Sequence, residues 1–108
     1  MIRNAFTMQL KKGKEQVYQE RHDALWPELK ALLHAHGILN YSIFLDAATG
    51  KLFAFQELLP DHTSDQLKNT EIMQRWWAAM ADLMETHPNN EPIVEPLKEV
   101  FTFPKDLF

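Results

Sequence analysis

The chain has 108 residues, of which 45% are hydrophobic and 24% charged, a composition typical of a folded domain rather than of a disordered chain. Its net charge of −4, from 15 acidic and 11 basic residues, lacks the basic excess that binding to nucleic-acid phosphates requires. There are no cysteines, which excludes disulfides, thiolate nucleophiles and cysteine metal sites. We expect residues 1–108 to form a single domain. Because the N-terminus resembles no signal peptide and no apolar stretch is long enough to cross a bilayer, we also expect a cytoplasmic protein without membrane contact.

The first half of the chain begins with an alternating pattern. Apolar and polar side chains alternate over residues 2–10, which predicts a β-strand. From Lys14 the apolar residues recur at spacings of three and four, which predicts a helix. Pro27 disfavours helical geometry at Trp26, so the helix should break there and restart with the proline in its first turn. Gly37 is placed to end the second helical piece.

The second half contains two apolar, aromatic-rich runs and a further helix. Ile38–Asp46 and residues 51–59 are separated by a short connection that contains a glycine, which predicts an antiparallel hairpin. After a polar stretch, Thr70 is placed to cap a helix that continues to Met84. Residues 94–103 form a last predicted strand, in which Leu97, Phe101 and Phe103 share one face.

This order of elements predicts the α+β class and a ferredoxin-like βαββαβ fold, with helices covering one face of a four-stranded antiparallel sheet. The strands carry few charges on the other face, which a monomer would expose to water. We therefore expect a homodimer in which two sheets meet face to face as a dimeric αβ-barrel.

Three groups of side chains are candidates for chemistry. Tyr18 and His22 lie four residues apart and share a helix face, although a core tyrosine beside a surface histidine would give the same spacing. Trp76 and Trp77 are consecutive, so their rings diverge by about 100° on a helix. They can pack in the core or form the wall of a small-molecule pocket. Tyr41 shares the apolar row of its strand, and its hydroxyl needs either a protein partner or a ligand.

Metal and nucleotide sites are not expected. His34 and His36 point away from each other on a helix, and the remaining histidines form no convincing metal-binding set. The chain has three glycines, far apart, so it has no glycine-rich phosphate-binding loop. The predicted site therefore contains no metal and no nucleotide cofactor.

Several segments together resemble the L-rhamnose mutarotase family. They are Ile2-Arg3-Asn4-Ala5-Phe6, Tyr18-Gln19-Glu20-Arg21-His22, Leu25-Trp26-Pro27-Glu28-Leu29, Asn40-Tyr41, Leu45-Asp46, Gln74-Arg75-Trp76-Trp77 and Leu97-Lys98-Glu99-Val100-Phe101. The resemblance implies a cytoplasmic ferredoxin-like dimer that interconverts the α and β anomers of L-rhamnose without a cofactor. Carried over by motif, His22 corresponds to the proton donor, and Tyr18, Tyr41, Trp76 and Trp77 correspond to sugar-contacting positions. Residues 105–108 extend past the usual end of the family.

Mutarotation opens and recloses a cyclic hemiacetal and moves only protons, which suits a histidine that titrates near neutral pH. We hypothesise that His22 protonates the ring oxygen while Tyr18 or a water assists at the anomeric hydroxyl. Glu20, Asp23 and Glu57 are candidate partners that would hold the histidine tautomer. Two other functions use similar aromatic cavities: a dimeric αβ-barrel monooxygenase acting on haem or an aromatic polyketide, and a non-catalytic sugar-binding module.

Overall fold

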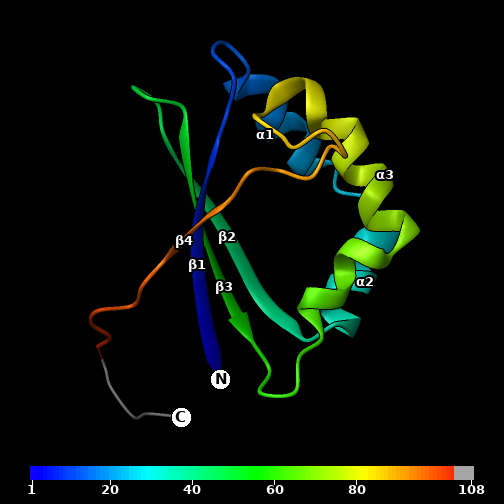
Figure 1. The fold of residues 1–108 in the computed structure, drawn as a ribbon, viewed down its shortest axis with the longest axis vertical. Helices are drawn as coiled ribbons and strands as arrows, with labels where there is room; N and C mark the ends of the chain where they lie inside the picture. The colour runs from blue at the N-terminus through cyan, green and yellow to red at the C-terminus, as the bar shows by residue number, and fades with distance from the viewer. Residues whose placement is uncertain (104–108) are drawn as a thin grey trace.

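The computed structural model describes residues 1–103, and its centre is a four-stranded sheet. The strands are β1 (Ile2–Gln9), β2 (Ile38–Asp46), β3 (Lys51–Leu58) and β4 (Glu95–Leu97), arranged in the order β2-β3-β1-β4. Every neighbouring pair is antiparallel. The helices α1 (Glu15–Asp23), α2 (Pro27–Ala35) and α3 (Glu71–Met80) gather on one side of this sheet (Figure 1). The predicted α+β class and ferredoxin-like arrangement are therefore confirmed.

The hairpin between β2 and β3 sets the register of the sheet. Gly50 adopts a φ of +75°, which favours glycine, and its N–H donates to the Asp46 carbonyl at 2.8 Å. The resulting pairing places Tyr41 opposite Gln56, and Gln56 in turn opposite Asn4 of β1. Because directly opposed residues share a face, the register aligns these three side chains across the sheet on the side that faces the helices.

Local sequence signals determine where the helices begin. Trp26 is extended, with ψ of 131°, and Pro27 is the first residue of α2, as the break at this proline predicted. The Thr70 hydroxyl accepts a hydrogen bond of 3.3 Å from the Met73 N–H, which confirms the predicted cap of α3.

Tertiary pairing shortens two of the predicted elements. The last helix was expected to reach Met84, but α3 ends at Met80 and a 3₁₀ turn, η2 (Ala81–Leu83), follows. Met84 instead forms an isolated bridge with Leu10, which lies just outside β1, and the Leu83 carbonyl accepts from the Lys11 N–H at 2.8 Å. These bonds direct the chain away from the helix. A second 3₁₀ segment, η1 (Ser64–Asn69), occupies the polar stretch before α3.

The last strand is much shorter than predicted. Only Glu95–Leu97 pairs with β1, so the expectation of a strand over residues 94–103 was wrong. The chain then leaves the sheet (Figure 1), and the side chains of Phe101 and Phe103 are 78% and 85% exposed. Alternation of residue types does not show whether a partner strand is present. The extension over residues 105–108 lies outside the described residues.

The core lies between the sheet and the helices. Leu29 of α2, Leu52 of β3 and Leu83 of η2 are each about 1% exposed, and burying a leucine side chain contributes about 1.5–3 kcal/mol. Tyr18 and Trp76 belong to the same cluster of buried residues. Two of the predicted site residues are thus anchored in the core. Within residues 1–103, no helix is both long and apolar enough to cross a membrane.

Candidate active site

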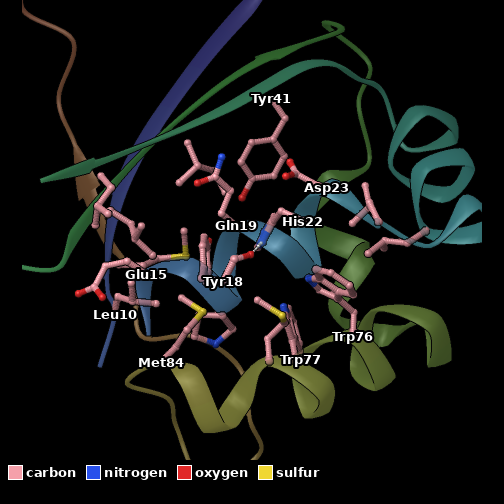
Figure 2. Close-up of a pocket in the computed structure, with 18 of the residues that line it drawn as sticks. Leu10, Glu15, Tyr18, Gln19, His22, Asp23, Tyr41, Trp76, Trp77 and Met84 are labelled. Atoms are coloured by element: carbon pink, nitrogen blue, oxygen red, sulfur yellow. Dashed lines mark hydrogen bonds between the residues drawn. The ribbon is translucent and has the colours of Figure 1, made fainter. Parts of the chain in front are cut away.

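A cavity of about 930 Å³ opens between the helix-facing side of the sheet and helices α1 and α3 (Figure 2). All five residues predicted for the site line it: Tyr18, His22, Tyr41, Trp76 and Trp77. They come from three separate segments of the chain, which the fold brings together. The structure thus places the predicted residues around one pocket.

The His22 ring is oriented by the backbone of its own helix. Its Nδ1 atom lies 3.0 Å from the carbonyl oxygen of Tyr18, four residues earlier in α1. A carbonyl oxygen only accepts hydrogen bonds, so Nδ1 carries the proton, and in the neutral ring Nε2 keeps its lone pair. None of the three carboxylates considered from the sequence holds the tautomer. The sequence nevertheless indicated this partner, because a side chain on a helix can reach the backbone carbonyl four residues earlier.

Burial sets the charge of His22. Desolvation lowers its pKa below the ordinary value of 6.5, and this effect exceeds the opposing effects of the Tyr18 carbonyl and the negative charge of Asp23. The imidazole is therefore mainly neutral at neutral pH. In that state its Nε2 atom is a proton acceptor.

Aromatic rings enclose the imidazole on two sides. The ring of Tyr18 packs against His22 with centroids 4.2 Å apart, and Trp76 meets His22 edge-on at 5.4 Å. On its other side Trp76 contacts Trp26 at 5.2 Å, and the Arg75 guanidinium lies 5.7 Å from the Trp26 ring centre. Sequence reasoning assigned Trp26 no part in the site. Its place before Pro27 indicated a helix break, but only the packing shows that it supports Trp76.

The two consecutive tryptophans differ in burial, as expected from rings that point in different directions on a helix. Trp76 is 8% exposed and belongs to the buried core, whereas Trp77 is half-buried, and both line the cavity. For Trp76 the two alternatives raised by the sequence are both correct, because one ring packs in the core and also forms the pocket wall. The same holds for Tyr18, which is 8% exposed.

Tyr41 reaches the pocket from the sheet. Its side chain as a whole is 39% exposed, and its ring meets Phe6 edge-on at 6.4 Å. Its hydroxyl end points toward α1 (Figure 2). Burial of the hydroxyl raises the pKa of Tyr41 to about 12, and hydrogen bonding from the Gln56 amide opposes part of that rise. Burial also raises the pKa of Tyr18, with a smaller contribution from the nearby Tyr41.

Helix α1 adds polar groups to the pocket, and of these only Asp23 had a role in the sequence-based hypothesis, as a candidate partner of His22. Glu15, Gln19 and Asp23 line the cavity, and they recur every four residues on the helix. A signal was available for two of them, because Glu15 precedes Tyr18 by three residues and Gln19 precedes His22 by three, and residues three apart are neighbours on a helix. Within residues 1–103, no group of three or more histidine, cysteine or acidic side chains is placed to hold a metal ion.

The arrangement suits a small ring-shaped molecule that carries several hydroxyl groups. The aromatic walls can pack against its C–H faces, and the polar groups of α1 and Tyr41 can bind its hydroxyls. A neutral imidazole beside two phenols can accept and return a proton without other reagents.

Comparison with known proteins gives a consistent result. The family model described as L-rhamnose mutarotase matches residues 3–103. An L-rhamnose mutarotase of Bacteroides thetaiotaomicron is 54% identical over 94% of this chain and 97% of its own, and one of Formosa agariphila is 52% identical over the same shares. A crystal structure of L-rhamnose mutarotase from Formosa agariphila superposes with a TM-score of 0.88 at 51% identity, covering 94% of this chain and 98% of the other.

Proposed function

This chain belongs to the L-rhamnose mutarotase family, and from that premise we propose that it interconverts the α and β anomers of L-rhamnose by proton transfer at His22. The activity assigns it to the isomerases. The observation that carries the proposed mechanism is the 3.0 Å contact between His22 Nδ1 and the Tyr18 carbonyl, because it leaves Nε2 as a base inside the pocket.

Ring opening requires one proton to leave the anomeric hydroxyl and another to reach the ring oxygen. The neutral imidazole takes the first at Nε2 while a hydroxyl donor supplies the second, and the bond between C1 and the ring oxygen breaks to give the open-chain aldehyde. After rotation about the C1–C2 bond, both protons return as the ring closes on the other face of the carbonyl. In this order His22 first accepts a proton, the reverse of the sequence-based hypothesis in which it protonates the ring oxygen.

No cofactor enters this scheme, because every step moves only protons. Positioned general acid–base catalysis typically contributes about 10²–10⁴-fold, which is a useful acceleration of a reaction that water already performs slowly. The tryptophan walls would pack against the apolar face of the sugar and its methyl group. A single methyl-sized difference in an apolar pocket is worth about 1–3 kcal/mol, so related sugars should also be converted, at lower efficiency.

The homodimer expected from the sequence belongs to the same proposal. On the sheet face away from the helices, Phe44 and Phe55 are 62% and 50% exposed and their rings pair at 6.0 Å. Val100 and Phe101 add exposed apolar surface in the segment after β4. A second copy packed on this face would bury these side chains. The cytoplasmic location stays a prediction.

The proposal is tested by mixing the purified protein with L-rhamnose and measuring exchange between the anomeric protons by saturation-transfer NMR. We expect wild type to accelerate exchange and His22→Ala to lose about 10²–10⁴-fold in rate. The matched control is His36→Ala, since His36 makes the same contact with a carbonyl four residues back, at 2.9 Å, without lining the cavity.

Measurements of sugar binding and of haem-dependent oxygen uptake, made beside the exchange assay, distinguish the alternative functions. Sugar binding with unchanged anomer exchange would identify a non-catalytic binding module. Haem-dependent oxygen uptake without anomer exchange would identify a monooxygenase. Equal activity of wild type and His22→Ala would retain the isomerase and remove His22 from its mechanism.

A further inference from the structure

Three polar side chains lie in a row across the sheet, and the row ends at Tyr41, which lines the pocket. Asn4 of β1 is opposite Gln56 of β3, and Gln56 is opposite Tyr41 of β2. Directly opposed residues in an antiparallel sheet have Cβ atoms about 4.5–5.5 Å apart, within reach of one another's polar ends. Two of the three, Asn4 and Gln56, have no part in the mechanism described so far.

The row has a direction, because amide groups have distinct donor and acceptor ends. The Asn4 side-chain amide donates from Nδ2 to Gln56 Oε1 at 3.0 Å. With Oε1 engaged by Asn4, the end of Gln56 that remains for Tyr41 is its NH₂ group, which only donates. The register places Gln56 directly opposite Tyr41, and hydrogen bonding from Gln56 lowers the pKa of Tyr41, in the sense that favours negative charge on the phenol oxygen. A hydrogen bond from the Gln56 NH₂ group to the Tyr41 oxygen would leave the Tyr41 proton free to point into the pocket.

We propose that Gln56, oriented by Asn4, is a positioning residue that makes the Tyr41 hydroxyl the proton donor to the ring oxygen of the sugar. This inference rests on the proposed function, in which the donor to the ring oxygen was left open. As the bond between C1 and the ring oxygen breaks, the Tyr41 proton passes to that oxygen while His22 Nε2 takes the proton of the anomeric hydroxyl. Both protons return when the ring closes, so no further reactant is needed.

The geometry of the two phenols favours Tyr41 over Tyr18 in this role. Tyr18 belongs to the same helix as His22, and its ring is stacked on the imidazole with ring centroids 4.2 Å apart. Tyr41 projects from the sheet toward α1, on the other side of the pocket from His22 (Figure 2). A sugar bound between α1 and the sheet would therefore contact His22 on one side and Tyr41 on the other. A base and an acid on opposite walls suit a reaction that removes and adds a proton at two different oxygens.

The test reverses the direction of the row while keeping its shape. Gln56→Glu still accepts from Asn4 but cannot donate to Tyr41, so the Tyr41 hydroxyl must donate its hydrogen bond to the carboxylate and not to the sugar; we expect kcat/KM to fall about 100-fold, mainly through kcat. Asn4→Asp can only accept, so it should turn the Gln56 NH₂ toward itself and the Gln56 oxygen toward Tyr41, with a loss of about 30-fold.

Two further variants remove the hydrogen bonds without reversing them. Gln56→Met has similar length and no polar end, and we expect about a tenfold loss of kcat/KM. Asn4→Ala releases Gln56 but leaves it able to donate to Tyr41, with a loss of about threefold. If Asn4 and Gln56 had a purely structural role, the order of the losses in kcat/KM would be reversed. Asn4→Ala and Gln56→Met would then lose more activity than Asn4→Asp and Gln56→Glu.

The chain offers a matched control for the added charges. Asn69 donates to Gln66 at 3.2 Å in an equivalent surface pair within η1, and neither residue lines the cavity. Gln66→Glu and Asn69→Asp should stay within about twofold of wild type, because they change the same groups away from the pocket. All variants are compared at a pH on the activity plateau, and thermal unfolding establishes that each is folded.

The decisive comparison uses a Tyr41→Phe background. If Gln56 acts through the Tyr41 hydroxyl, adding Gln56→Glu to Tyr41→Phe produces no further loss, as a double-mutant cycle requires for coupled residues. Equal losses for Gln56→Glu in both backgrounds, or a smaller loss for Asn4→Asp than for Asn4→Ala, would overturn the inference. Absence of anomer exchange in wild type would instead refute the proposed function, so the two failures are distinguishable.

Discussion

The protonation state of His22 gives the sharpest prediction about the reaction. Burial lowers the pKa of His22 below its ordinary value of 6.5. At pH 7.5 more than about 90% of the ring is then neutral, since each pH unit above a pKa changes the charged-to-neutral ratio tenfold. If the neutral ring is the active base, kcat/KM should be flat around neutral pH and fall about tenfold per unit at pH values below the pKa of His22.

Asp23 provides the perturbation that tests this assignment. Its negative charge raises the pKa of His22, so Asp23→Asn should lower that pKa further. The acidic limb of the kcat/KM profile is therefore expected to move to lower pH. The position of this limb is the readout, and not the height of the plateau, because Asp23 also lines the cavity. Glu20→Gln is the control, because it removes an equal charge from α1 at a position that does not line the cavity.

The assay is saturation-transfer NMR of L-rhamnose from about pH 4.5 to pH 8.5, with the rate of the sugar alone subtracted at each pH because water catalyses the same exchange. A rate that rises as the pH falls through the His22 titration would refute the reasoning. That result would make the imidazolium the active form and restore the order in which His22 first protonates the ring oxygen. An Asp23→Asn profile that superposes on wild type would show that Asp23 does not act on His22.

Three further predictions follow from packing. Trp26→Ala removes the ring that supports Trp76 at 5.2 Å and should lower kcat/KM about tenfold, measured by the same exchange assay, with Trp26→Phe recovering most of the activity. Leu83→Ala, at a side chain 1% exposed, should cost about 2–5 kcal/mol in the free energy of unfolding measured with urea, and a cost below about 1 kcal/mol would contradict the assigned core. Phe55→Glu should convert the expected dimer to a monomer in light scattering, whereas a monomeric wild type would refute the dimer itself.

The fold and the identities of the main site residues were accessible from sequence because they depend on local patterns. Alternation identified β1, Pro27 located the start of α2, and Thr70 the start of α3, since strand pleats, the missing proline N–H and helix caps act over a few residues. His22 and Trp76 were found by helical spacing and by the family resemblance. Their gathering around one cavity then follows from the order of the elements.

Tertiary structure alone decided the features that depend on contacts between distant segments. The early end of α3 follows from the pairing of Met84 with Leu10, and β4 is short because its hydrogen bonding to β1 stops at Leu97. Neither pairing can be recognised from a local sequence pattern. The row from Asn4 through Gln56 to Tyr41 requires the register of three strands.

His22 combines both kinds of information. Its bond to the Tyr18 carbonyl follows from helical spacing within one turn of α1. The lowered pKa that makes it a base depends on burial, because desolvation comes from side chains contributed by the whole fold. The sequence by itself therefore determined which histidine lies at the site and which of its nitrogens the helix can hold, while the packed structure decided the charge state of that histidine.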